Sequence, residues 1–155
     1  MRKTILITTF IAGTLDILAA FIQSYAANNV LPSTVLKYIA SGVFGNNAFA
    51  GGAEMIAFGL IVHYFIAFAC TYCFFWAYPR WTFLRQSVAL NSVLIALIAW
   101  AVTTRLIVPF SQARHAPFNI VNALIAIGIL IVCVGLPIAY FAKRYYVQKS
   151  SSYRG

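Results

Sequence analysis

Four apolar segments, each about as long as a lipid bilayer is thick, dominate this sequence. They cover residues 4–25, 52–78, 84–108 and 119–142. The hydrocarbon core of a bilayer is about 30 Å thick, and an α-helix needs roughly 20 apolar residues to cross it. Because these segments use most of the 155 residues, no room remains for a soluble domain. The sequence therefore predicts a single all-α domain over residues 1–155, an integral membrane four-helix bundle.

The charge composition agrees with a membrane location. Only 8% of the residues are charged, whereas a soluble domain carries about 25%. The net charge of +9 comes from 11 basic and two acidic residues, which in a soluble protein would suggest nucleic-acid binding. Here the basic residues lie at the ends of the apolar segments, so we expect membrane lipids as partners and no nucleic acid.

The basic residues also predict an orientation. If the N-terminus is cytoplasmic, eight of them lie on the inner side and three on the outer side, which satisfies the positive-inside rule. The outer set is Lys37, Arg105 and Arg114; the inner set is Arg2, Lys3, Arg80, Arg85, Lys143, Arg144, Lys149 and Arg154. Four spans then return the C-terminus to the cytoplasm. The alternative that the first segment is a cleaved signal is disfavoured by Asp16 in its apolar core.

Three features mark the regions between and after the spans. Residues 33–44 have apolar side chains at helical spacing on one face and Ser33, Lys37 and Ser41 on the other, which predicts a short interfacial helix on the outer side. An aromatic cluster ends the second span and is typical of an interfacial belt. The basic tail, residues 143–155, is rich in Ser and Tyr and is expected to be partly disordered. The aromatic cluster consists of Phe74, Phe75, Trp76, Tyr78 and Trp81.

Two ionisable residues lie deep in the spans and are the main candidates for a functional site. Asp16 and His63 are twelve and eleven residues from the starts of antiparallel spans, which places them at a similar depth. Each lies on a stripe of small or polar residues, Asp16 together with Gln23, and small residues favour close helix contact. We expect the two side chains to approach within hydrogen-bonding or single-water distance. The pair would either bind a proton or cation or hold two helices in register.

Two further sets of residues are candidates for specific roles. Glu54 and Arg105 lie at the outer ends of the second and third spans and are predicted to form an ion pair. The alternative is an anion-attracting entrance formed by the remaining basic residues of the outer side. Pro137 removes a backbone hydrogen bond and, with Gly135, is expected to kink the fourth span and to form a possible hinge.

No sequence pattern indicates a cofactor or a metal site. Cys70 and Cys73 have the spacing of redox and metal motifs, but they lie within an apolar span and have no second Cys/His pair nearby. Cys133 also lies in an apolar segment. An enzyme would have to use Asp16, Glu54 and His63, and nothing indicates a type of reaction.

Several short motifs, taken in order, resemble a family of small uncharacterised bacterial inner-membrane proteins with four predicted transmembrane helices. They include Gly13-Thr14-Leu15-Asp16, Tyr38-Ile39-Ala40-Ser41-Gly42, Ala48-Phe49-Ala50-Gly51-Gly52, Gly59 with His63, Val108-Pro109-Phe110-Ser111 and Gly135-Leu136-Pro137-Ile138-Ala139. The resemblance implies a bacterial cytoplasmic-membrane location and four spans. It implies no substrate. Thr103-Thr104-Arg105 departs from the Asn-containing, mostly apolar segment expected there.

Three functions are compatible with these features. The first is transport or permeation of a small solute or ion through a polar centre at Asp16 and His63, and four helices per chain then favour a homo-oligomer or a larger membrane complex. The second is a structural or accessory membrane protein in which the same residues join helices. The third is a membrane-embedded enzyme acting on lipid or quinone. A cavity that reaches Asp16 would favour the first.

Overall fold

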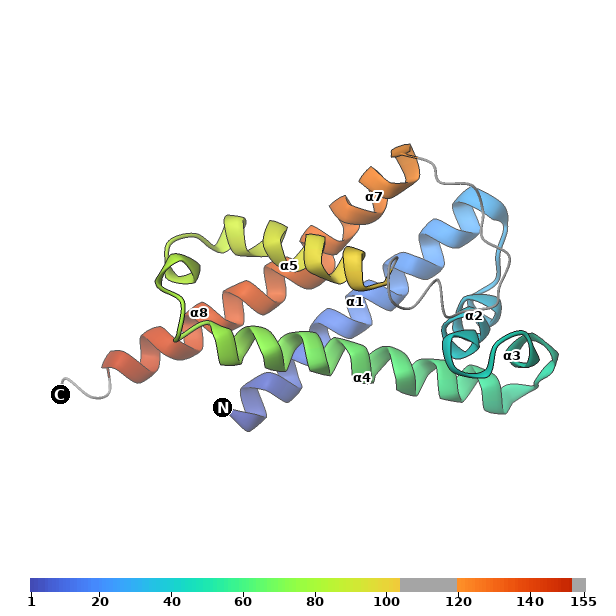
Figure 1. Ribbon diagram of the computed structural model, residues 1–155, viewed down its shortest axis with the longest axis horizontal. Coiled ribbons are helices and arrows are strands. Elements are labelled where there is room, and N and C mark those ends of the chain that lie inside the picture. The colour runs from blue at the N-terminus through green and yellow to red at the C-terminus, as the bar shows by residue number, and fades with distance from the viewer. Residues whose placement is uncertain (104–119, 152–155) are drawn as a thin grey trace.

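Helices form every regular element in the part of the chain that the computed structural model describes, residues 1–103 and 120–151. The chain is therefore all-α over these residues, as predicted. Figure 1 shows long helices packed side by side, with the start of α1 and the end of α8 toward the same end. The elements are α1 (Arg2–Asn28), α2 (Pro32–Phe44), α3 (Asn47–Ala50), α4 (Ala53–Ala77), the 3₁₀ turn η1 (Thr82–Arg85), α5 (Val88–Val102), α7 (Ile120–Leu130), the π turn η3 (Ile131–Gly135) and α8 (Leu136–Ser151).

Three of the helices are long and apolar enough to cross a membrane. They are Arg2–Asn28, Ala53–Ala77 and the continuous stretch Ile120–Lys149, and they correspond to the predicted first, second and fourth spans. The third apolar helix, α5, is described over 15 residues, which is about 22 Å of helix. The predicted end of this span at residue 108 lies outside the described residues.

The third helix begins later than predicted. Residues 82–85 form the 3₁₀ turn η1, and α5 starts at Val88 rather than at residue 84. Ser87 has an extended backbone, and its side chain accepts a hydrogen bond of 3.3 Å from the Leu90 N–H. Serine is a preferred N-cap because its oxygen satisfies an otherwise unpaired amide of the first turn. The capping serine, and not the apolar pattern, sets the start of α5.

The tail, residues 143–155, is predicted to be partly disordered. Its residues 143–151 continue α8 as a helix, and residues 152–155 lie outside the described residues. Tyr146 explains the order, because its hydroxyl donates a 2.8 Å hydrogen bond to the Phe75 carbonyl. Its ring also stacks on Tyr78, with a centroid distance of 5.3 Å. These contacts attach the basic helix to the end of α4.

The aromatic cluster at the end of α4 is divided between core and surface. Phe74, Phe75 and Tyr78 are buried, and Phe75 is fully inaccessible. Only Trp76 and Trp81 are exposed, as an interfacial belt requires. Three of the five predicted belt residues therefore belong to the core, where Phe75 and Tyr78 contact the tyrosines of α8.

The short helix predicted at residues 33–44 is present as α2, and Figure 1 shows it at the opposite end from the start of α1. Gly59 of α4 has no side chain, so the α2 backbone at Leu36 packs directly against it. Ser41, on the predicted polar face, is fully buried, and its hydroxyl donates to the Tyr38 carbonyl at 2.6 Å. Val43, on the predicted apolar face, is 61% exposed.

The π turn η3 (Ile131–Gly135) lies where the sequence predicts a kink at Gly135 and Pro137, and the kink itself stays a prediction. The Leu136 N–H donates to the Ile131 carbonyl, five residues earlier, and Pro137 has no N–H to donate. Gly135 lies against the backbone of Ser92 in α5, so that a Cβ at this position would overlap the Ser92 carbonyl. The wide turn therefore brings two helix backbones into contact. Hinge motion at this position stays a prediction.

Substituting Gly135 by Ala is expected to destabilise the protein by about 1–3 kcal/mol, because the added methyl group overlaps backbone that cannot rotate away. Gly128 is a matched control on the same long helix, where an added Cβ meets nothing within 4 Å. Gly128→Ala should be neutral or slightly stabilising, since alanine is the better helix former. Unfolding in detergent, followed by circular dichroism, measures both. Equal stability of the two variants would contradict the close packing.

Candidate functional site

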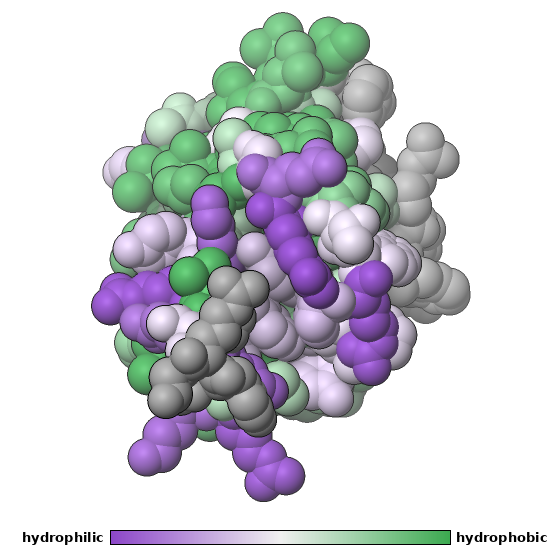
Figure 2. Space-filling view, turned by 90° about the vertical axis from the view of Figure 1, so that its left-hand side faces the viewer, coloured by the Kyte–Doolittle hydropathy of each residue, from purple (hydrophilic) through white to green (hydrophobic). Residues whose placement is uncertain are grey.

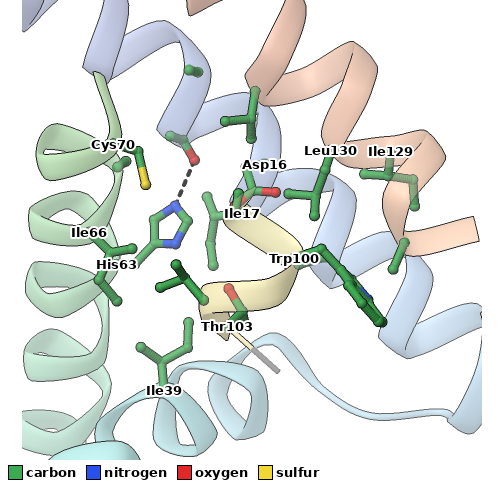
Figure 3. Close-up of a pocket in the computed structure, with 18 of the residues that line it drawn as sticks. Asp16, Ile17, Ile39, His63, Ile66, Cys70, Trp100, Thr103, Ile129 and Leu130 are labelled. Carbon is green, nitrogen blue, oxygen red and sulfur yellow. Dashed lines mark hydrogen bonds between the residues drawn. The ribbon is translucent and has the colours of Figure 1, made fainter. Parts of the chain in front are cut away.

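A cavity of about 340 Å³ lies between the helices around Asp16 and His63. This volume is within the range of small-molecule sites. Figure 3 shows side chains from the long helices and from α2 surrounding the space. Its lining is mostly apolar, and the polar side chains are few: Asp16, Gln23, Tyr38, His63, Cys70, Trp100 and Thr103.

Helix α1 contributes the polar stripe that the sequence predicted. Gly13, Asp16, Ala20 and Gln23 all line the cavity, because spacings of three and four residues return to the same face of an α-helix. All three predicted members of the intramembrane polar site, Asp16, Gln23 and His63, therefore lie around one space.

His63 projects from α4 and is 9% exposed. Its Nε2 atom lies 2.8 Å from the Gly13 carbonyl oxygen (Figure 3). A carbonyl oxygen can only accept, so Nε2 carries the proton and donates it to α1. This bond fixes the tautomer and links α1 to α4.

Asp16 and His63 share the cavity, but His63 forms its hydrogen bond with backbone rather than with the carboxylate. Gly13 lies three residues before Asp16 on the same face of α1, and its missing side chain leaves room for Tyr64 and Ala67 of α4 to pack against it. Among the hydrogen bonds of the described residues, none joins the two side chains directly. Their approach to single-water distance stays a prediction.

A second contact between α1 and α4 lies beside this bond. The hydroxyl groups of Thr14 and Tyr64 are 2.7 Å apart, and Tyr64 also stacks on Phe10 with a centroid distance of 6.1 Å. Both hydroxyl residues follow directly after the Gly13 and His63 positions in sequence. Sequence analysis missed this pair because threonine and tyrosine are common in membrane helices without a polar partner.

The remaining walls come from helices that the sequence analysis did not connect with the site. Trp100 and Thr103 line the cavity from the end of α5, and Ile129 and Leu130 line it from α7. No ionisable residue in these segments distinguished them from other apolar helix surface. Their position depends on helix packing, which the apolar pattern alone does not determine.

Of the predicted outer ion pair, Glu54 and Arg105, only Glu54 is among the described residues. Glu54 is exposed in the first turn of α4. Its Oε1 accepts a hydrogen bond of 2.6 Å from the Gly52 N–H, at the helix end where the dipole favours an anion. This contact gives Glu54 a local structural role at the start of α4.

Within the described ranges, no group of three His, Cys, Asp or Glu side chains is arranged to hold a metal ion. Cys70, Cys73 and Cys133 are free thiols. Cys70 lines the cavity, whereas Cys73 is exposed and is not among the lining residues. The arrangement therefore offers one carboxylate, one imidazole, one amide, two hydroxyl groups, one thiol and one indole in a mostly apolar space.

Replacing His63 by Leu is expected to lower the free energy of unfolding by about 1–2 kcal/mol, because a buried interhelical hydrogen bond is lost. Tyr64→Phe should cost roughly 0.6 kcal/mol through loss of the Thr14 contact. Tyr72→Phe, an exposed position on the same helix, provides the control and should leave stability unchanged. Unfolding in detergent measures all three. An unaffected His63→Leu variant would show that the bond to Gly13 contributes nothing.

The geometry of the cavity is the basis for inferring its role. Comparisons with protein-family models, with curated proteins and with solved structures find no match to this chain. A buried apolar space with a few convergent polar groups is the usual form of a ligand site. Among the groups that line this cavity, the carboxylate of Asp16 has the strongest effect on which ligand the cavity would favour.

Proposed function

We propose that the chain is a four-span protein of a bacterial inner membrane in which Asp16 lies in a site for permeation or transport of a small solute or ion. Three long apolar helices support the membrane location. The apolar helix α5, described over 15 residues, supports a fourth span. The bacterial assignment rests on the sequence resemblance.

The distribution of charge supports cytoplasmic N- and C-termini. Figure 2 shows hydrophilic side chains gathered over the end of the molecule where α1 begins and α8 ends. The α4–α5 turn, with Arg80 and Arg85, lies at this end as well. Lys37 belongs to α2 at the opposite end. An excess of basic residues marks the cytoplasmic side of an inner-membrane protein.

Cysteine labelling tests this orientation. In a background free of the three native cysteines, Lys37→Cys should react with a membrane-impermeant maleimide in intact cells, because it faces the periplasm. Phe83→Cys, in the α4–α5 turn, should react only after the membrane is permeabilised. Both positions are accessible enough to label, since Phe83 is 42% exposed and Lys37 is partly exposed. The reverse pattern would overturn the orientation.

The observation that carries the transport proposal is that a cavity of about 340 Å³ reaches Asp16. An ionisable side chain in a membrane span costs about 2.5–3.5 kcal/mol on insertion scales and usually faces a cavity or a partner. A carboxylate that served only to join helices would be expected in a closed, paired core. Open space beside Asp16 instead leaves room for a ligand or for water.

The charges around the cavity favour a cation or a proton as the transported species. Among the described lining residues there is no Lys or Arg, so the carboxylate is the dominant charge. The Nε2 proton of His63 is directed to Gly13. The side chains with oxygen atoms that line the cavity are Asp16, Gln23, Tyr38 and Thr103, and oxygen is the donor that hard cations prefer. A pathway through only four helices favours a homo-oligomer.

A structural or accessory role is the second candidate, and the bond between His63 and Gly13 favours it. This bond and the Thr14–Tyr64 contact hold α1 against α4. Such contacts need no ligand. The two candidates differ in what they require of Asp16, because helix association would tolerate an amide at that position.

Asp16→Asn is expected to reduce cation or proton flux by roughly ten-fold or more, since a charge-assisted contact with the ion is worth about 1.5–3 kcal/mol. Glu54→Gln removes the only other acidic side chain and is the matched control, with flux unchanged. Purified protein in liposomes containing a pH-sensitive dye, driven by a potassium diffusion potential, gives the rates. Circular dichroism verifies that both variants fold.

Two results would contradict the proposal. The first is a wild-type flux no greater than that of protein-free liposomes. The second is an Asp16→Asn variant that is as active as the wild type. A folded but less stable Asp16→Asn variant, together with absent wild-type flux, would favour the accessory role.

A further inference from the structure

A second cavity, of about 460 Å³, lies at the opposite end of the molecule from α2. The residues that line it are distant in sequence from Asp16. It is formed where the α4–α5 turn meets the last turns of α8 (Figure 1). Its lining residues are Tyr78, Pro79, Arg85, Lys143, Tyr146, Val147 and Lys149. None of them belongs to the site at Asp16, and the transport proposal does not use them.

The lining is strongly cationic. Arg85, Lys143 and Lys149 bring three positive charges to one pocket. The chain has only two acidic residues, and neither lies here: Asp16 lines the first cavity, and Glu54 is in the first turn of α4 at the other end. No acidic side chain of this chain therefore neutralises the pocket, which favours an anion from outside.

The walls are held by specific contacts rather than by loose surface side chains. Arg85 Nη2 donates to the Pro79 carbonyl at 2.5 Å, which folds the α4–α5 turn around the guanidinium group. Tyr146 is fixed by its 2.8 Å bond to the Phe75 carbonyl and by its stacking on Tyr78. The two lysines come from exposed positions of α8 and can turn toward a ligand.

The depth of the pocket indicates where that anion would lie. Helix α4 ends at Ala77, and the third candidate span ends at Lys149, so the pocket is located where these spans would leave the hydrocarbon. Trp76 and Trp81, both more than half exposed, lie at the same end of α4, as aromatic side chains do at a membrane interface. Lipid phosphate groups occupy this level.

We propose that this pocket binds the phosphate group of an anionic phospholipid. Arginine and lysine bind phosphate through charge-assisted hydrogen bonds, and basic pockets between membrane helices on the cytoplasmic side bind anionic headgroups. Tyr78, whose ring stacks on Tyr146, forms part of the wall of the same pocket. The shared chemistry is a phosphate anion, and the location at the span ends favours a lipid over a soluble phosphate.

Native mass spectrometry of the full chain in detergent can test the proposal by titration with phosphatidylglycerol, phosphatidylcholine and inorganic phosphate. The test variant carries Lys143→Gln and Lys149→Gln. The control carries Arg2→Gln and Arg144→Gln, which removes the same charge from exposed positions outside the pocket. Each basic residue near an anionic lipid is worth about 1 kcal/mol, or roughly five-fold in affinity.

We expect the wild type to bind phosphatidylglycerol more tightly than phosphatidylcholine. The test variant should lose about ten-fold or more of this affinity, whereas the control should change by less than about three-fold. Arg85→Gln is a second test variant and should also weaken binding. Elution volume and helical content verify that each variant is folded.

Three outcomes would overturn the proposal. Equal losses in the test and control variants would show that only overall charge matters. Unchanged affinity in the test variant and in Arg85→Gln would remove the pocket from lipid binding. Inorganic phosphate that binds as tightly as phosphatidylglycerol, and is lost in the same variants, would reassign the pocket to a soluble anion.

Discussion

Backbone contact at two glycines determines how these helices pack. At Gly59 the backbone of α2 lies directly on α4, and at Gly135 the π turn lies directly on α5. Apolar side chains distinguish poorly between neighbouring helices and lipid, so association in a membrane depends on close packing of small residues. A side chain at either position would separate the paired backbones. Helices α2 and α5 both contribute walls of the cavity around Asp16, and the position of each depends on one of these contacts.

Several polar side chains of the long helices form hydrogen bonds inside the protein. Thr8, Thr71 and Ser92 each donate to the carbonyl four residues earlier in their own helix, so they need no partner elsewhere. His63 instead bonds across to Gly13, and Thr14 to Tyr64. These two contacts lie beside Asp16 and fix α1 against α4. The carboxylate is thus positioned by its neighbours, while its own side chain reaches the cavity.

Periodicity and hydropathy predicted the features that are determined within a single helix. The bounds of α1, α2 and α4, and the polar stripe with Asp16 and Gln23, follow from spacing along a single segment. The burial of Ser41 and Phe75 was missed because it depends on which helix covers each face. The helical tail was missed for a related reason: Tyr146 is ordered by a carbonyl 71 residues earlier. The sequence did not predict that Trp100 lines the cavity, because no feature of the α5 sequence distinguishes the face on which it lies.

Helix α8 and the π turn before it connect the two cavities. Val134 and Ile138 line the space around Asp16, and Lys143 lines the basic pocket. Ile138 and Lys143 are separated by five residues of helix, about 7.5 Å. Rotation of this helix would change both sites together, and Gly135 packed on Ser92 opposes such rotation. Ile138 is fully buried, as are Ala139 and Ala142, which lie between Ile138 and Lys143 in the sequence. The same packing that shapes the cavity around Asp16 therefore also fixes the backbone of α8, which carries Lys143 and Lys149.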